Sequence, residues 1–159
     1  MLKIIGAVAV ILSATLLGMK KYNDIFERRR TLQEIFDGCI QVKNALRCIC
    51  APLHESFLCG GDFFRTASGK IKEGMLPEEA IKDTAHGVKV LKKEDLNIIE
   101  RFAAGLSAQD LKGQIANMEL FTKLLEMEIK NATDELNSRG KLYVKGSVLT
   151  AAAVVLLLI

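Results

Sequence analysis

One charge-free stretch near the start of the chain restricts its fold more than any other feature. Residues from Ile4 to Met19 carry no charged side chain, and Lys3 and Lys20 flank them. A helix of this length spans about 24 Å, close to the roughly 30 Å of a bilayer hydrocarbon core. We therefore expect residues 1–20 to form a retained transmembrane anchor rather than a cleaved signal peptide, since no good cleavage site follows.

A second apolar stretch, from Gly146 to Ile159, closes the chain. Alone it spans about 21 Å as a helix, and about 27 Å when it begins at Leu142. Lys145 can extend its amine toward the lipid headgroups from within such a span. The sequence therefore predicts a C-terminal transmembrane anchor over residues 142–159.

Basic residues beside the two stretches predict the orientation. Positive charge flanks their inner ends, at Lys20, Lys21, Arg28-Arg29-Arg30, Arg139, Lys141 and Lys145. By the positive-inside rule, residues 21–141 form a cytoplasmic domain. The only tyrosines, Tyr22 and Tyr143, fall at the same two boundaries, where amphipathic rings are favoured. A reducing compartment disfavours disulfides among the four cysteines.

The central domain is almost neutral. The stretch from Lys20 to Lys141 holds 20 of the 22 Lys and Arg residues and all 19 Asp and Glu residues, a net charge of +1. This balance gives no general attraction toward nucleic acid, so we expect no nucleic-acid partner.

Spacings of three and four between apolar residues predict helices throughout the domain. A long helix continues from the first anchor to about Cys50, where Pro52 stops it. Four short helices follow: one from Pro52 to Leu58, one that Asp62 caps and Gly74 ends, one from Pro77 to Gly87, and one from Lys93 to Gly105. Ser107 to Asp110 begin the last long helix. We predict an all-α antiparallel bundle of about six helices, flanked by an N-terminal and a C-terminal transmembrane helix.

The sequence offers one cluster of metal-ligand types, Cys48, Cys50, His54 and Cys59. Cys48 and Cys50 lie about 200° apart around a predicted helix, so packing in the core is favoured over zinc binding. A membrane-anchored cysteine module for metal or redox chemistry is the alternative. No nucleophile–histidine spacing or phosphate-binding glycine motif is present. We expect a non-enzymatic protein with no cofactor and no small-molecule substrate.

Arg28-Arg29-Arg30 has three interpretations: a topology signal, a site for an acidic partner, or a lipid-binding collar of a regulator. The three side chains point in different directions on a helix, so a partner surface engages at most two of them. Arg28 and Arg30 are the candidates.

Taken end to end, the chain resembles the stage III sporulation protein AB family of endospore-forming bacteria. The residues that carry the resemblance are the opening MLKIIGAVAVILSATLLG, the arginine-rich turn before Leu32, Pro52-Leu53-x-Glu55, Leu91-Lys92-Lys93 with Phe102, Leu106 with Asp110 and Gln114, and the terminal Leu156-Leu157-Leu158-Ile159.

The resemblance implies a place in the mother-cell membrane that faces the forespore, with the central domain in the mother-cell cytoplasm. It implies a component of the transenvelope channel complex, whose partners are a cytosolic secretion-type ATPase and other stage III channel proteins. The family's soluble part is similar to the cytoplasmic domain of type II secretion inner-membrane platform proteins.

Asp110 and Gln114 are the candidate partner-binding residues on the last long helix. They stand four apart and therefore share one helix face. Asp110 has the alternative role of capping that helix, whereas Gln114 has none.

Overall fold

The computed structural model describes residues 2–49, 52–106, 110–140, 146 and 149, without the side chains of 2–11, 14, 49, 139 and 140. All of the regular structure in these residues is helical. The predicted all-α class is therefore confirmed. The chain divides into two compact units, one of residues 1–29 with 131–159 and one of residues 30–130.

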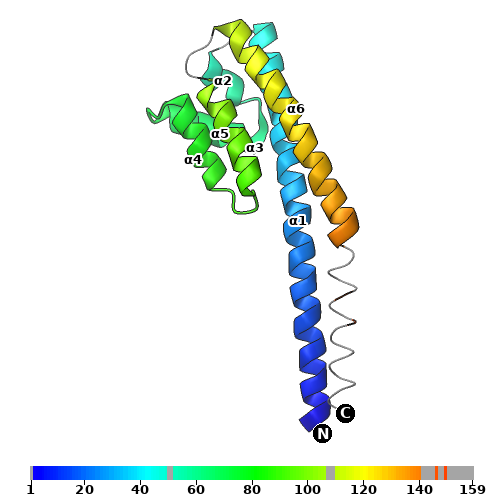
Figure 1. Cartoon of the computed structure of the whole chain (residues 1–159). Coiled ribbons are helices and arrows are strands. Elements are labelled where there is room, and N and C mark those ends of the chain that lie inside the picture. Colours follow the sequence, from blue (N-terminus) through cyan, green and yellow to red (C-terminus); the bar gives the residue numbers. More distant parts are fainter. Residues whose placement is uncertain (1, 50–51, 107–109, 141–145, 147–148, 150–159) are drawn as a thin grey trace. The chain divides into compact units, whose positions relative to one another are not determined.

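Two long and four short α-helices follow one another along the described part of the chain (Figure 1). They are α1 (Leu2–Ile49), α2 (Leu53–Phe57), α3 (Gly61–Lys72), α4 (Pro77–His86), α5 (Lys93–Ala104) and α6 (Leu111–Glu135), and a π-helical turn, η1 (Leu136–Gly140), follows α6. The number of α-helices and most of their ends agree with the prediction.

Within the unit of residues 30–130, α1 and α6 pack side by side and run in opposite directions (Figure 1). The apolar seams of α1 and α6, whose side chains recur every three or four residues, are buried: Leu32, Ile35, Cys39, Val42 and Leu46 from α1, and Met118, Phe121 and Leu125 from α6. The Sγ atom of Cys39 lies 4.0 Å from the carbonyl oxygen of Met118. The two halves of the seam therefore meet, as spacings of three and four require.

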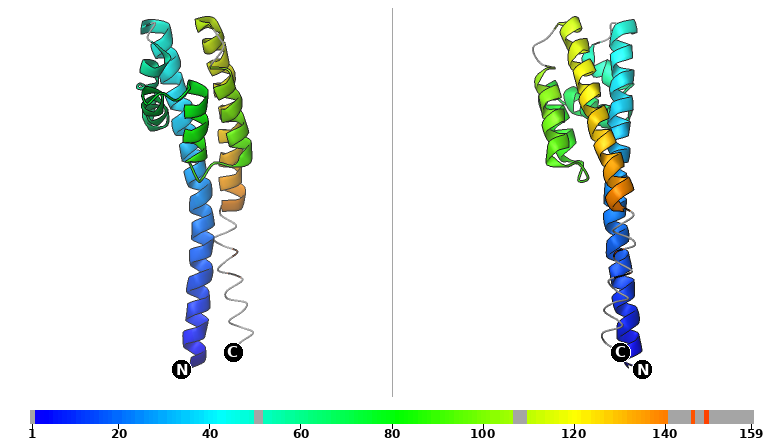
Figure 2. Two further views of the ribbon diagram at one scale, coloured as in Figure 1. Left: turned by 90° about the vertical axis from the view of Figure 1, so that its left-hand side faces the viewer. Right: turned by 45° about the vertical axis from the view of Figure 1, so that its right-hand side comes forward.

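Of the short helices, α3 and α4 lie beside α1, and α5 lies beside α6 (Figure 2). A row of aromatic rings joins them to α6. The ring centroids of Phe57 and Phe64 lie 5.3 Å apart, those of Phe64 and Phe102 6.4 Å, and those of Phe102 and Phe121 4.2 Å. These four side chains are almost fully buried. They form the centre of a core to which α2, α3, α5 and α6 all contribute.

One predicted helix start needs correction. Asp62 does not cap α3, because α3 already begins at Gly61, whose φ of +76° suits glycine. Asp62 instead lies in the first turn, where its negative charge interacts favourably with the helix dipole. At α6 the cap is Asp110, which accepts a hydrogen bond of 2.9 Å from the backbone N–H of Gly113. The predicted start at Ser107 lies outside the described residues.

In the described part of the chain, no helix is both long enough and apolar enough to cross a membrane. The predicted anchor over residues 1–20 falls in α1, where the side chains of 2–11 and 14 are not described. The predicted anchor over residues 142–159 lies outside the described residues, apart from 146 and 149. Both anchors stay predictions.

Candidate functional site

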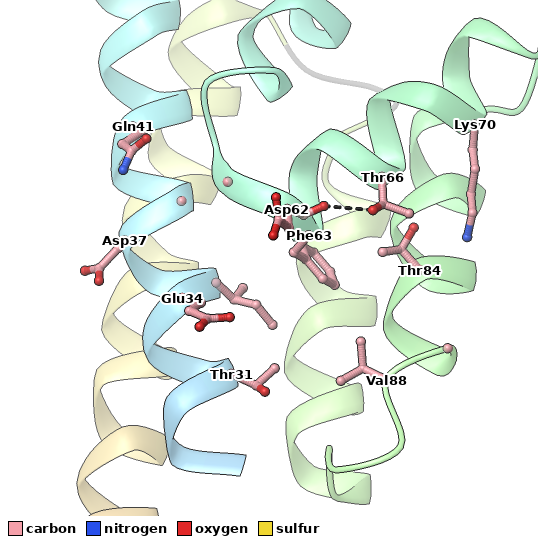
Figure 3. A pocket seen from close by; sticks show the side chains of 14 residues that line it. Thr31, Glu34, Asp37, Gln41, Asp62, Phe63, Thr66, Lys70, Thr84 and Val88 are labelled. Atoms are coloured by element: carbon pink, nitrogen blue, oxygen red, sulfur yellow. Dashed lines mark hydrogen bonds between the residues drawn. The ribbon is translucent and has the colours of Figure 1, made fainter. Parts of the chain in front are cut away.

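A groove lies between α1, α3 and α4, within the unit of residues 30–130. Its volume is 710 Å³. Ile35 of α1, Phe63 of α3 and Val88 after α4 supply its apolar lining. In Figure 3, Thr31 and Glu34 point from α1 toward Phe63 and Val88 across the groove.

Glycines determine the shape of this groove. A Cβ atom at Gly38 would overlap the carbonyl oxygen of Gly60, so α1 and the turn before α3 touch backbone to backbone. At Gly61 a Cβ atom would meet nothing within 4 Å. The close approach at Gly38 therefore brings α3 against α1, while Gly61 leaves the space beside it open.

The charged residues that line the groove are mostly acidic. Glu34, Asp37 and Asp62 contribute carboxylates, and Lys70 is the one lining cation among the described residues. Lys70 donates a hydrogen bond of 2.7 Å to Asp83, and this contact lowers the pKa of the Asp83 carboxyl. The charge of Lys70 is thus already neutralised from α4.

Two of these carboxylates have weak local partners. Glu34 pairs with Arg30 at 3.0 Å, and both side chains are 62% exposed. Asp62 pairs with Arg65 at 3.3 Å, and its side chain is 99% exposed. Such exposed pairs contribute little to stability and are readily exchanged for other partners. The groove therefore presents available negative charge beside apolar side chains.

A second, smaller groove lies between α5 and α6, with a volume of 380 Å³. Its apolar lining consists of Ile98, Phe102, Leu120, Phe121 and Leu124. Two polar residues, Arg101 and Asn117, also line it. Leu120 is 58% exposed, and Met127 further along α6 is 61% exposed. The outer face of α6 therefore carries more apolar surface than the core requires.

The structure gives the two predicted residues at the start of α6 different roles. Asp110 is exposed and caps the helix through Gly113. Gln114 is half-buried in the first turn, and its backbone N–H donates to the carbonyl oxygen of Asp110 at 2.9 Å. The capping alternative for Asp110 is confirmed. Partner binding by either residue stays a prediction.

The three arginines do point in different directions, as predicted. Arg28 is only 4% exposed, and its Nη1 atom lies 3.5 Å from Oε2 of Glu135. Arg29 donates a hydrogen bond of 3.2 Å to Thr133, whereas Arg30 is exposed beside Glu34. Arg28 thus already has an internal partner, and Arg30 is the more accessible of the two candidates.

The boundary residues are partly described. Lys20 and Lys21 are exposed, and Tyr22 is half-buried. Tyr143 and Lys145 lie outside the described residues.

Two cysteines of the Cys48, Cys50, His54 and Cys59 cluster do not pack in the core as predicted. Cys39 is buried, and burial raises its pKa to about 12. Cys48 and Cys59 are exposed, because they lie at the end of α1 and in the turn after α2, beyond the buried seam. Among the described residues, no group of three or more histidine, cysteine or acidic side chains is placed to hold a metal ion. Cys50 lies outside them.

The groove residues Glu34, Asp62 and Phe63 had no distinguishing signal in the sequence. The only hint was glycine: Gly38 interrupts a helical pattern, and Gly60-Gly61 separates two helices. A glycine inside a helical pattern can mark a close backbone approach, but the pattern does not say which segment approaches.

Comparison with known proteins identifies the family. The family model for stage III sporulation protein AB matches residues 3–159. Neither the curated proteins nor the solved structures contain a significant match. The match covers nearly the whole chain, and it agrees with the resemblance found in the sequence. The chain therefore belongs to the stage III sporulation protein AB family.

Proposed function

We propose that the chain is a non-enzymatic platform, anchored in the mother-cell membrane, that docks a cytosolic ATPase onto the channel complex of stage III sporulation. The observation that carries this proposal is the family match over residues 3–159, which establishes a role in stage III sporulation. The resemblance to secretion platform proteins supports the docking role.

The charge pattern supports the membrane anchors. A stretch without charge from Ile4 to Met19 is followed by the basic residues of 20–30, and the chain closes on an apolar run after Lys145. This pattern favours two spans with the domain between them in the cytoplasm.

The domain surface supports a binding role. Grooves lined by apolar side chains open between α1, α3 and α4 and between α5 and α6. We place the ATPase contact at the start of α6, around Gln114, whose side chain is not needed for the cap that Asp110 provides. Among the described residues, no group of three or more histidine, cysteine or acidic side chains supports the metal-binding alternative.

The test is affinity purification from sporulating cells. A tagged full-length chain, solubilised in mild detergent at stage III, should bring down the ATPase in stoichiometric amounts. A tagged chain that recovers other channel proteins but no ATPase, even after cross-linking, contradicts the docking role.

A further inference from the structure

The groove between α1, α3 and α4 combines an apolar lining with acidic side chains. Its lining is apolar at Ile35, Phe63 and Val88, and its charged residues are Glu34, Asp37 and Asp62 against one neutralised lysine. A groove with these properties suits an amphipathic segment whose apolar side chains enter the groove while its cations meet the carboxylates.

We infer that this groove binds a basic amphipathic segment of a partner protein, with lysine or arginine beside Glu34 and Asp62 and an apolar side chain against Phe63. This inference goes beyond ATPase docking, which we place at the start of α6. It therefore holds or fails independently of the proposed function.

Charge complementarity identifies the occupant. Anionic lipid, nucleic acid and acidic peptides would each meet like charge at Glu34, Asp37 and Asp62, which disfavours binding. The competing cations Arg30 and Arg65 are held only in exposed pairs, with 62% and 59% of their side chains accessible. A basic segment can replace them at little cost, because such pairs are weak.

The size of the groove agrees with a peptide segment. At 710 Å³ it falls within the range of about 300–1,000 Å³ typical of ligand sites. Thr31 and Gln41 of α1 and Thr66 of α3 also line it, so polar partners for a peptide backbone are present. Figure 3 shows the Thr66 hydroxyl bonded to the backbone carbonyl oxygen of Asp62, and the Asp62 carboxylate itself is held in the exposed pair with Arg65.

The experiment uses the full chain in detergent and a fluorescein-labelled helical peptide in which two leucines four residues apart are flanked by lysines. Fluorescence anisotropy should show saturable binding that weakens as salt rises, because both partners of each contact are exposed. A peptide with glutamate in place of every lysine should not bind.

Paired variants locate the site. Glu34→Gln with Asp62→Asn removes two groove carboxylates without changing side-chain shape, and should weaken peptide binding about tenfold at low salt. The matched control, Glu126→Gln with Asp134→Asn, removes two exposed carboxylates elsewhere and should bind like the wild type. Both double variants should melt within a few degrees of the wild type.

Three results would overturn the inference. In the first, the groove variant binds the lysine peptide as tightly as the wild type. In the second, the control variant loses as much affinity as the groove variant, so that general charge explains binding. In the third, the groove variant loses self-association while peptide binding is unchanged, which would assign the groove to a second copy of the chain.

Discussion

At the scale of single residues, the fold depends on a contact that only glycine permits. Gly38 of α1 faces the carbonyl of Gly60, and Gly60 in turn lies against Val42 and Phe64. Read from the sequence alone, Gly38 only weakens the helix, because glycine costs about 1 kcal/mol there relative to alanine. In the structure that cost is offset by the close packing of α1 on the start of α3.

Two glycine variants separate packing from helix propensity. Gly38→Ala should destabilise the protein by about 1–3 kcal/mol, because the added methyl group overlaps backbone that cannot move easily. Gly69→Ala in α3, where a Cβ atom meets nothing within 4 Å, should stabilise it by about 0.4–1 kcal/mol. Thermal unfolding followed by circular dichroism measures both, and equal effects of the same sign would contradict the packing contact.

Cys39 should make the stability depend on pH in the alkaline range. Burial raises the pKa of its thiol from 9.0 to about 12, and the charge of Lys43 opposes only part of this shift. Below pH 9 the thiol is neutral in both the folded and the unfolded chain, so the free energy of unfolding keeps its full value. As pH rises from 9 toward 12, the unfolded thiol ionises first and this stability is lost.

The check compares the wild type with Cys39→Ala. Between pH 9 and 11 the free energy of unfolding should fall more steeply for the wild type, by up to about 1.4 kcal/mol per pH unit. Parallel curves for the two proteins would show that Cys39 ionises as easily in the folded chain as in the unfolded chain.

At the scale of elements, periodicity accounts for most of the fold. Apolar spacings of three and four place the helices, and Pro52, Pro77, Gly74 and Gly87 mark their ends close to where the structure has them. The start of α3 differs from the prediction by one residue, because Gly61 with its positive φ begins the helix before Asp62. The groove was not predictable, because its residues come from three elements whose mutual placement depends on packing and not on any local pattern.

The unit that contains residues 1–29 and 131–159 holds a buried ion pair that joins α1 to α6. The side chain of Arg28 is 5% exposed and that of Glu135 is 21% exposed. Removal of one member of a buried ion pair is costly, so Glu135→Ala should destabilise the protein by about 3 kcal/mol. The double variant Arg28→Met with Glu135→Met should be more stable than Glu135→Ala, since it replaces both charges of the pair by apolar side chains.

Thermal unfolding of the full chain in detergent measures this pair. Melting temperatures that are equal in the wild type and in Glu135→Ala would mean that the pair contributes nothing to holding α1 against α6.

At the scale of the whole molecule, the proposed hairpin topology makes a prediction of its own. The basic residues beside both apolar stretches predict that residues 21–141 lie in the cytoplasm and that both ends lie across the membrane. A reporter that is active only outside the cytoplasm, fused after Ile159, should therefore be active. The same reporter inserted after Gly87, between α4 and α5, is the control and should be silent; activity there with silence at the end would contradict the topology.

If the chain docks the ATPase, the purified ATPase should bind the purified full-length chain. Biolayer interferometry should show saturable binding to the wild type.

Gln114→Ala should weaken binding at an unchanged melting temperature, since Gln114 contributes no cap. Asp110→Ala should lower stability by about 1 kcal/mol through the lost bond to Gly113. Absence of saturable binding to the folded wild-type chain would contradict ATPase docking, and wild-type affinity in Gln114→Ala would remove the contact from the start of α6.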